Sequence, residues 1–148
     1  MSDVLKIAVC QYNVFWNDPL ANFSTIEELT SELEYELLVL PEMFSSGYMA
    51  NPIELKDPLA IKVKKWLTNQ TSNSLILGSC ANKTGNTYYN SLLGYYKQKE
   101  VCNYKKAHTF IGGEQNYYSK GKTQSVIDFK DWKISLNICY DLRFPVWC

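Results

Sequence analysis

The clearest indication of the fold is the segment ELLVLPE, residues 36–42. Its short, uninterrupted apolar run is typical of a β-strand that is covered on both faces. On its N-terminal side, LKIAVCQ (residues 5–11) alternates between apolar and polar positions and predicts another strand. On its C-terminal side, SLILGSC (residues 74–80) predicts a third, buried strand.

Two helices are predicted between these three strands. In the first, Asp18 can cap the N-terminus and Pro19 suits the first helical position. Its expected buried face carries apolar residues at steps of three or four: Leu20, Phe23, Ile26, Leu29 and Leu33. Asp57 and Pro58 are expected to open the second helix. Its expected buried side carries Leu59, Val63, Trp66 and Leu67. The order strand, helix, strand, helix, strand implies parallel pairing with right-handed crossovers, so we predict one α/β domain.

The second half of the chain changes character. NTYYNSLLGYY (residues 86–96) and KEVCNYKKAH (residues 99–108) are runs that contain aromatic residues, and they predict a hairpin. A loop rich in glycine and tyrosine follows at residues 111–122, and two further strands are expected on either side of Lys130 and Asp131.

Composition narrows the class of protein. The chain has 148 residues, of which 46% are hydrophobic, and its 15 Lys+Arg balance 15 Asp+Glu. A neutral globular composition of this kind does not suggest nucleic-acid or membrane binding, and we see neither a signal peptide nor a membrane helix. The five scattered cysteines fit free thiols in a reducing compartment, so we expect a cytoplasmic protein.

Three reactive side chains follow predicted strands. Glu42 and Cys139 each stand at the end of an apolar run, and Lys106 follows the strand that ends near Tyr104. Sites in α/β proteins gather at such strand ends. A carboxylate can take the proton of a thiol, and an ammonium can stabilise an oxyanion, with help from the backbone N–H of Tyr140.

Four segments carry a family resemblance: LPEMFSSGY, YKKAHTF, GGEQNYYSKG and NICYDLRFPVW. With them the chain resembles the nitrilase superfamily of carbon–nitrogen hydrolases, and above all its ω-amidase-like branch. The resemblance implies a catalytic triad of Glu42, Lys106 and Cys139. It also maps a second family glutamate, which positions the lysine or assists proton transfer, onto Glu114. One departure is Thr109, which stands where the family usually has leucine.

The resemblance further implies a fold and an activity. The fold is an αββα sandwich, and residues 1–148 would be the N-terminal part of a carbon–nitrogen hydrolase domain with its later strands and helices missing. The activity is hydrolysis of a nonpeptide C–N bond in a small ω-amide, such as α-ketoglutaramate, through a thioester on the cysteine. No cofactor or metal is implied. Family dimers often use elements beyond the nucleophile, so a homo-oligomer is not carried over to this chain.

Other interpretations stay open at the level of sequence. The chain could be an inactive, truncated remnant of such an enzyme. His108, the single histidine, could pair with Cys139 as a Cys-His dyad, although we favour a structural role near the site. Glu114 lies in a loop, where carboxylates are often exposed. We expect the remaining strand cysteines to be small buried residues: Cys10, Cys80 and Cys102.

Overall fold

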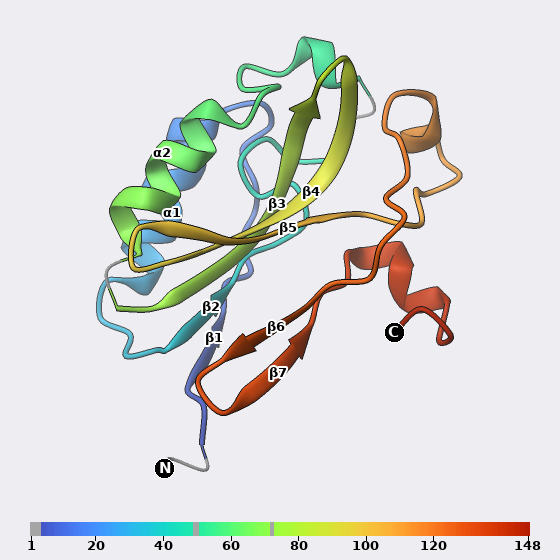
Figure 1. Cartoon of the computed structure of the whole chain (residues 1–148). Coiled ribbons are helices and arrows are strands. Elements are labelled where there is room, and N and C mark those ends of the chain that lie inside the picture. The colour runs from blue at the N-terminus through green and yellow to red at the C-terminus, as the bar shows by residue number, and fades with distance from the viewer. Residues whose placement is uncertain (1–3, 49–50, 72) are drawn as a thin grey trace.

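The structure, a computed structural model, describes residues 4–48, 51–71 and 73–148. Its main sheet has five strands in the order β1-β2-β3-β4-β5 (Figure 1). The first three strands pair in parallel: β1 (Ile7–Val9), β2 (Leu37–Val39) and β3 (Leu75–Thr84). Two antiparallel strands complete the sheet: β4 (Thr87–Tyr96) and β5 (Lys99–Lys105). The predicted parallel strands and the predicted hairpin are therefore confirmed.

Both long helices cover one face of this sheet: α1 (Pro19–Thr30) and α2 (Ile61–Gln70). The Asp18 carboxylate accepts the Ala21 N–H at 3.2 Å, so the expected cap of α1 is present. The start of α2 was placed too early, because the helix begins at Ile61. Asp57 still caps it, since its carboxylate accepts the N–H groups of Ile61 and Val63 at 2.9 and 3.0 Å.

The predicted buried face of α1 is partly wrong. Leu20, Leu29 and Leu33 are 67%, 50% and 54% exposed, and Leu33 lies beyond the end of the helix. The residues that face the sheet are instead Pro19, Asn22, Phe23 and Ile26. The buried face of the helix is rotated toward Asn22, because the Asn22 amide donates to the backbone carbonyls of Phe15 and Ser45. Similarly, Leu59, expected in the buried side of α2, is 41% exposed.

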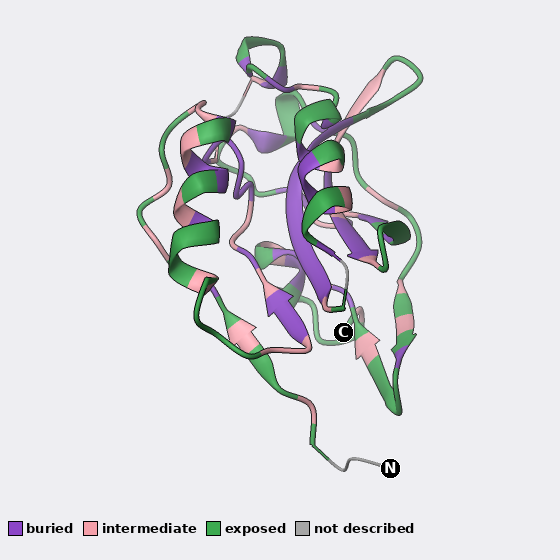
Figure 2. Cartoon of the chain, turned by 90° about the vertical axis from the view of Figure 1, so that its left-hand side faces the viewer, coloured by how far each residue is buried: buried purple, intermediate pink, exposed green. Residues whose placement is uncertain are grey.

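Two hydrophobic clusters lie on the two faces of the sheet. Between helices and sheet, the Phe23 ring stacks on Trp66 at a centroid distance of 4.9 Å, and both pack near Phe44. The opposite face packs against a separate two-stranded sheet, β6 (Val126–Phe129) and β7 (Trp132–Ser135). The described chain thus has helix, sheet and sheet layers. The first eight residues of β3 are buried and its last two are exposed, so most of this strand is drawn in purple in Figure 2.

Three short 3-10 helices complete the elements: η1 (Pro52–Glu54), η2 (Glu114–Asn116) and η3 (Cys139–Arg143). Two of them, η2 and η3, carry residues of the predicted site. No helix among the residues that the structure describes is both long enough and apolar enough to cross a lipid bilayer.

Candidate active site

Glu42 leaves the sheet just after β2, at a turn held by β3. The next residue, Met43, has a φ of 54°, and its N–H donates to the Ser79 hydroxyl at 2.9 Å. The Phe44 N–H donates to the Ser79 carbonyl at 3.2 Å. Left-handed backbone is uncommon for a residue with a side chain and persists only where neighbouring structure enforces it. These bonds to β3 therefore fix the direction in which the Glu42 carboxylate points.

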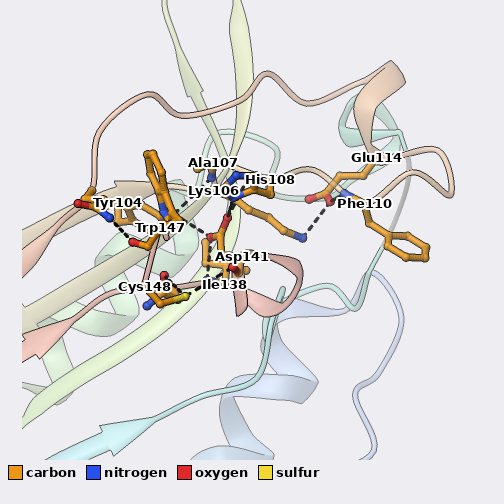
Figure 3. Close-up of polar contacts among 12 residues, drawn as sticks. Tyr104, Lys106, Ala107, His108, Phe110, Glu114, Ile138, Asp141, Trp147 and Cys148 are labelled. Carbon is orange, nitrogen blue, oxygen red and sulfur yellow. Dashed lines mark hydrogen bonds and ion pairs between the residues drawn. The ribbon is translucent and has the colours of Figure 1, made fainter. Parts of the chain in front are cut away.

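Lys106 lies buried between two carboxylates. It is 1% exposed, and its Nζ lies 2.7 Å from Glu42 Oε1 and 2.9 Å from Glu114 Oε2. Burial by itself lowers the pKa of this lysine, but the hydrogen bonds and negative charges of the two glutamates outweigh that effect and raise it. Lys106 is therefore a fixed cation, and Figure 3 shows its side chain reaching toward Glu114.

Glu114 is fully buried, contrary to the exposure expected of a loop carboxylate. It is 0% exposed and begins η2, directly after Gly113, whose φ of 118° brings the chain inward. Besides Lys106, its Oε2 accepts the Phe110 N–H at 2.6 Å. Because a buried carboxylate needs partners for its charge, the lysine and this N–H explain how the loop tolerates it.

Cys139 opens η3 in a left-handed conformation, with a φ of 45°. Its thiol is free and exposed, unlike the buried thiols of Cys10, Cys80 and Cys102, which behave as predicted. Burial of part of the side chain raises the pKa of the Cys139 thiol, and the charge of Glu42 and a hydrogen bond with it raise it further. The positive charge of Lys106 acts in the opposite direction. The sulfur thus lies next to the site's carboxylate.

Glu42 and Cys139 line the same cavity, which has a volume of about 290 Å³. Its walls come from β2, β3, β4 and the segment that follows β7, and include Val39, Leu77, Leu92 and Ile138. A thiol, a carboxylate and apolar walls in one space suit a small acyl compound whose reacting carbonyl meets the sulfur.

Asp141 holds the turn that presents Cys139. It is 0% exposed, and its Oδ1 accepts the backbone N–H of His108 at 2.8 Å and lies 2.9 Å from His108 Nδ1. Its Oδ2 accepts the Tyr104 hydroxyl at 2.7 Å and the Ile138 N–H at 3.0 Å. Figure 3 shows Asp141 at the centre of these partners. One carboxylate therefore ties the end of β5 and the His108 loop to the residue that precedes Cys139.

His108 belongs to this Asp141 cluster. Its imidazole stacks on the Phe144 ring at a centroid distance of 3.8 Å and meets the Trp147 ring edge-on at 5.3 Å. The thiol of Cys139 instead has Glu42 as a hydrogen-bond partner. The geometry therefore favours the structural role of His108 over the Cys-His dyad.

Tyr140 is the second residue of η3, where an N–H group has no acceptor within its own helix. Its ring packs edge-on against Phe110 and Phe144, both at a centroid distance of 5.5 Å. These contacts fix the peptide unit beside Cys139. Within the described ranges, no three His, Cys, Asp or Glu side chains cluster in a way that could hold a metal ion.

Sequence reasoning missed two residues of the site. Asp141 stands inside the motif NICYDLRFPVW but was not assigned a role. Asn90 donates its amide to both Glu42 and Glu114, at 2.8 and 3.0 Å. Its one signal in the sequence is a large amide in a strand among apolar and aromatic neighbours, which is unusual unless the amide has partners.

Comparison with known proteins places the chain in a family. The family model for carbon–nitrogen hydrolases matches residues 6–147. Omega-amidase YafV from Yersinia enterocolitica is 34% identical over 147 residues, a match that covers 97% of this chain and 57% of that protein. 2-Oxoglutaramate amidase from Bacillus subtilis is 31% identical over 151 residues, covering 95% of this chain and 58% of that protein. The chain thus spans somewhat more than half the length of these relatives.

A solved structure agrees with the sequence matches. A carbon–nitrogen hydrolase superfamily protein from Xanthomonas campestris, with an arsenic adduct in its active site, superposes with a TM-score of 0.89 at 32% identity. The match covers 97% of this chain and 56% of that one. The resemblance seen in the four motifs is confirmed: the chain belongs to the carbon–nitrogen hydrolase family, within the nitrilase superfamily.

Proposed function

We propose that this chain carries the reacting groups of an amidase that hydrolyses a small ω-amide, such as α-ketoglutaramate, through a thioester on Cys139. The observation that carries the proposal is the contact of Lys106 with Glu42 and Glu114 beside the exposed thiol at the cavity. Relatives named omega-amidase and 2-oxoglutaramate amidase support the choice of substrate class.

In the proposed first step, Glu42 takes the thiol proton while the Cys139 sulfur attacks the amide carbon. The carbonyl electron pair moves onto oxygen, and the oxyanion is stabilised by the Lys106 ammonium and the Tyr140 N–H. The protonated Glu42 then gives its proton to the departing nitrogen, so ammonia leaves and a thioester remains. In the second step Glu42 takes a proton from water while the water oxygen attacks the thioester carbon. The carbon–sulfur bond then breaks and Glu42 returns the proton to the sulfur, which releases the acid and restores the Cys139 thiol.

The two glutamates differ in the access that such proton transfers require. The Glu42 side chain is 21% exposed and faces the cavity, whereas Glu114 is 0% exposed and is bound to Lys106 and a backbone N–H. We therefore assign proton transfer to Glu42. Glu114 instead holds the ammonium in position and compensates its charge.

The test is ammonia release from α-ketoglutaramate by the purified chain. We expect Cys139→Ala to abolish it and Cys148→Ala, which changes the other exposed thiol, to leave it unchanged. A folded, monodisperse sample without any activity would instead support the inactive remnant. Loss of turnover in His108→Ala together with its retention in Lys106→Ala would support the Cys-His dyad.

We also propose a cytoplasmic location and a small-molecule amide as the partner of this chain. All five cysteines are free, and an exposed thiol is best protected from oxidation in a reducing compartment.

A further inference from the structure

Asn90 contacts every member of the buried charge cluster. Its Nδ2 donates to Glu42 Oε1 at 2.8 Å and to Glu114 Oε1 at 3.0 Å. Its backbone carbonyl accepts the N–H of Lys106 at 2.9 Å. Asn90 is 1% exposed and belongs to β4, which has β3 on one side and β5 on the other. A single strand residue thus fixes both carboxylates through its side chain and the lysine through its main chain.

The charges of the cluster explain why such a residue is needed. Glu42 and Glu114 share one ammonium, so two anions face one cation in the interior. Two like charges at one site repel each other, so each carboxylate needs hydrogen-bond donors besides the shared ammonium. A primary amide carries two N–H bonds, and here each of them serves a different carboxylate. Hydrogen bonds donated to a carboxylate favour its charged form.

The orientation of the Asn90 amide supports the same role. Asn90 Oδ1 is buried and has no hydrogen-bond partner among the described residues. Buried polar atoms without partners are uncommon in folded proteins. If the amide were turned over, its oxygen would face the two carboxylates, and the repulsion would be worse. The fold therefore leaves one acceptor unsatisfied in order to keep both donors on the carboxylates.

We propose that Asn90 is a positioning residue, whose amide keeps Glu42 and Glu114 as two separate anions around Lys106 so that Glu42 is free to accept the proton of Cys139. This inference rests on the proposed function, since the role matters only if Glu42 acts on that thiol. Besides Glu42, Lys106 and Glu114 themselves, the titratable groups that act on this cluster are Tyr48 in the loop after β2, Tyr118 in the segment after η2, and Cys139 in η3.

The test is the pH dependence of Cys139 alkylation by iodoacetamide, followed by mass spectrometry of the peptide that contains it. The acid limb of this profile reports loss of the first proton from the Glu42–Cys139 pair. Asn90→Leu removes both donors, so we expect the limb to move to higher pH by about one unit. Asn103→Leu is the matched control, because Asn103 is an exposed asparagine of β5 that also donates to a glutamate. It should leave the limb in place.

Two further variants separate the outcomes. Asn90→Asp keeps the side-chain shape and adds a third carboxylate, so it should also move the acid limb to higher pH. This variant tests the role of Asn90 if Asn90→Leu does not fold. A limb that stays in place in the folded variant overturns the role of Asn90. If Glu42→Gln leaves the limb of the otherwise unchanged protein unaltered, the proposed function itself fails, because Glu42 is then not the base of Cys139.

Discussion

Replacing Asp141 with asparagine should destabilise the fold although the side chain barely changes in size. The Asp141 carboxylate faces four donors and is completely buried. An asparagine keeps one acceptor oxygen and puts an NH2 group where the other oxygen was. That group faces donors in either orientation of the amide.

The loss of stability is set by the orientation of the asparagine amide that costs less free energy. With the NH2 group in place of Oδ1, the imidazole of His108 can accept a hydrogen bond by changing tautomer, but the backbone N–H of His108 has no acceptor. A buried N–H without a partner costs about 1–3 kcal/mol. The hydrogen bonds from Tyr104 and Ile138 remain, but their acceptor is now neutral, which weakens each bond by about 1 kcal/mol. This weakening is partly offset because the variant no longer buries a negative charge. We expect Asp141→Asn to lower the free energy of unfolding by about 3 kcal/mol.

Urea unfolding followed by tryptophan fluorescence measures this change, provided that the slope against urea is the same in both proteins. The control is Asp128→Asn, because Asp128 is exposed and pairs with an exposed lysine, Lys133. The control should change the free energy by less than about 0.5 kcal/mol. A loss below about 1 kcal/mol in Asp141→Asn would refute the reasoning, because it is smaller than one charge-assisted bond.

Two further predictions concern the thiols and alkaline pH. A thiol reagent should label Cys139 and Cys148 rapidly in the native chain and reach the three buried cysteines only after unfolding. Mass spectrometry counts the labelled thiols, and rapid labelling of all five would contradict the burial of the other three. The second concerns buried tyrosines whose pKa burial raises to about 12: Tyr48, Tyr95 and Tyr104. Because the folded state holds these protons more tightly, their contribution to stability is complete below about pH 10 and is lost as the pH rises toward 12. The raised pKa of Lys106 acts in the same direction, so urea midpoints should fall above about pH 10, and ultraviolet titration should show a separate late tyrosinate phase.

Local patterns predicted the elements that position the site. The apolar run at residues 36–42 and its neighbours indicated three parallel strands, since such runs need cover on both faces. Lys106 directly follows β5, whereas Glu42 and Cys139 lie a few residues after β2 and β7. The polypeptide order alone was enough to place these groups near strand ends, because strand ends meet at sheet edges.

The sequence could not predict which groups pair with the buried polar side chains. Asn90 meets Glu42 across 48 positions of the chain, and Lys106 meets the same carboxylate across 64. No local periodicity records such contacts. The same holds for Asn22, which rotates the buried stripe of α1 because distant carbonyls need its amide.

The amino-acid order was thus sufficient to predict the alternation of strands and helices and the hairpin, and it picked out the carboxylate, ammonium and thiol that we propose to react. The tertiary structure was needed to show that Glu114 is buried and that the Asn90 amide donates to both Glu42 and Glu114. It was also needed to show that Asp141 holds the turn of Cys139. The physical reason is that hydrophobic periodicity is a short-range property of the chain. Compensation of buried charge depends instead on which groups meet once the chain has folded.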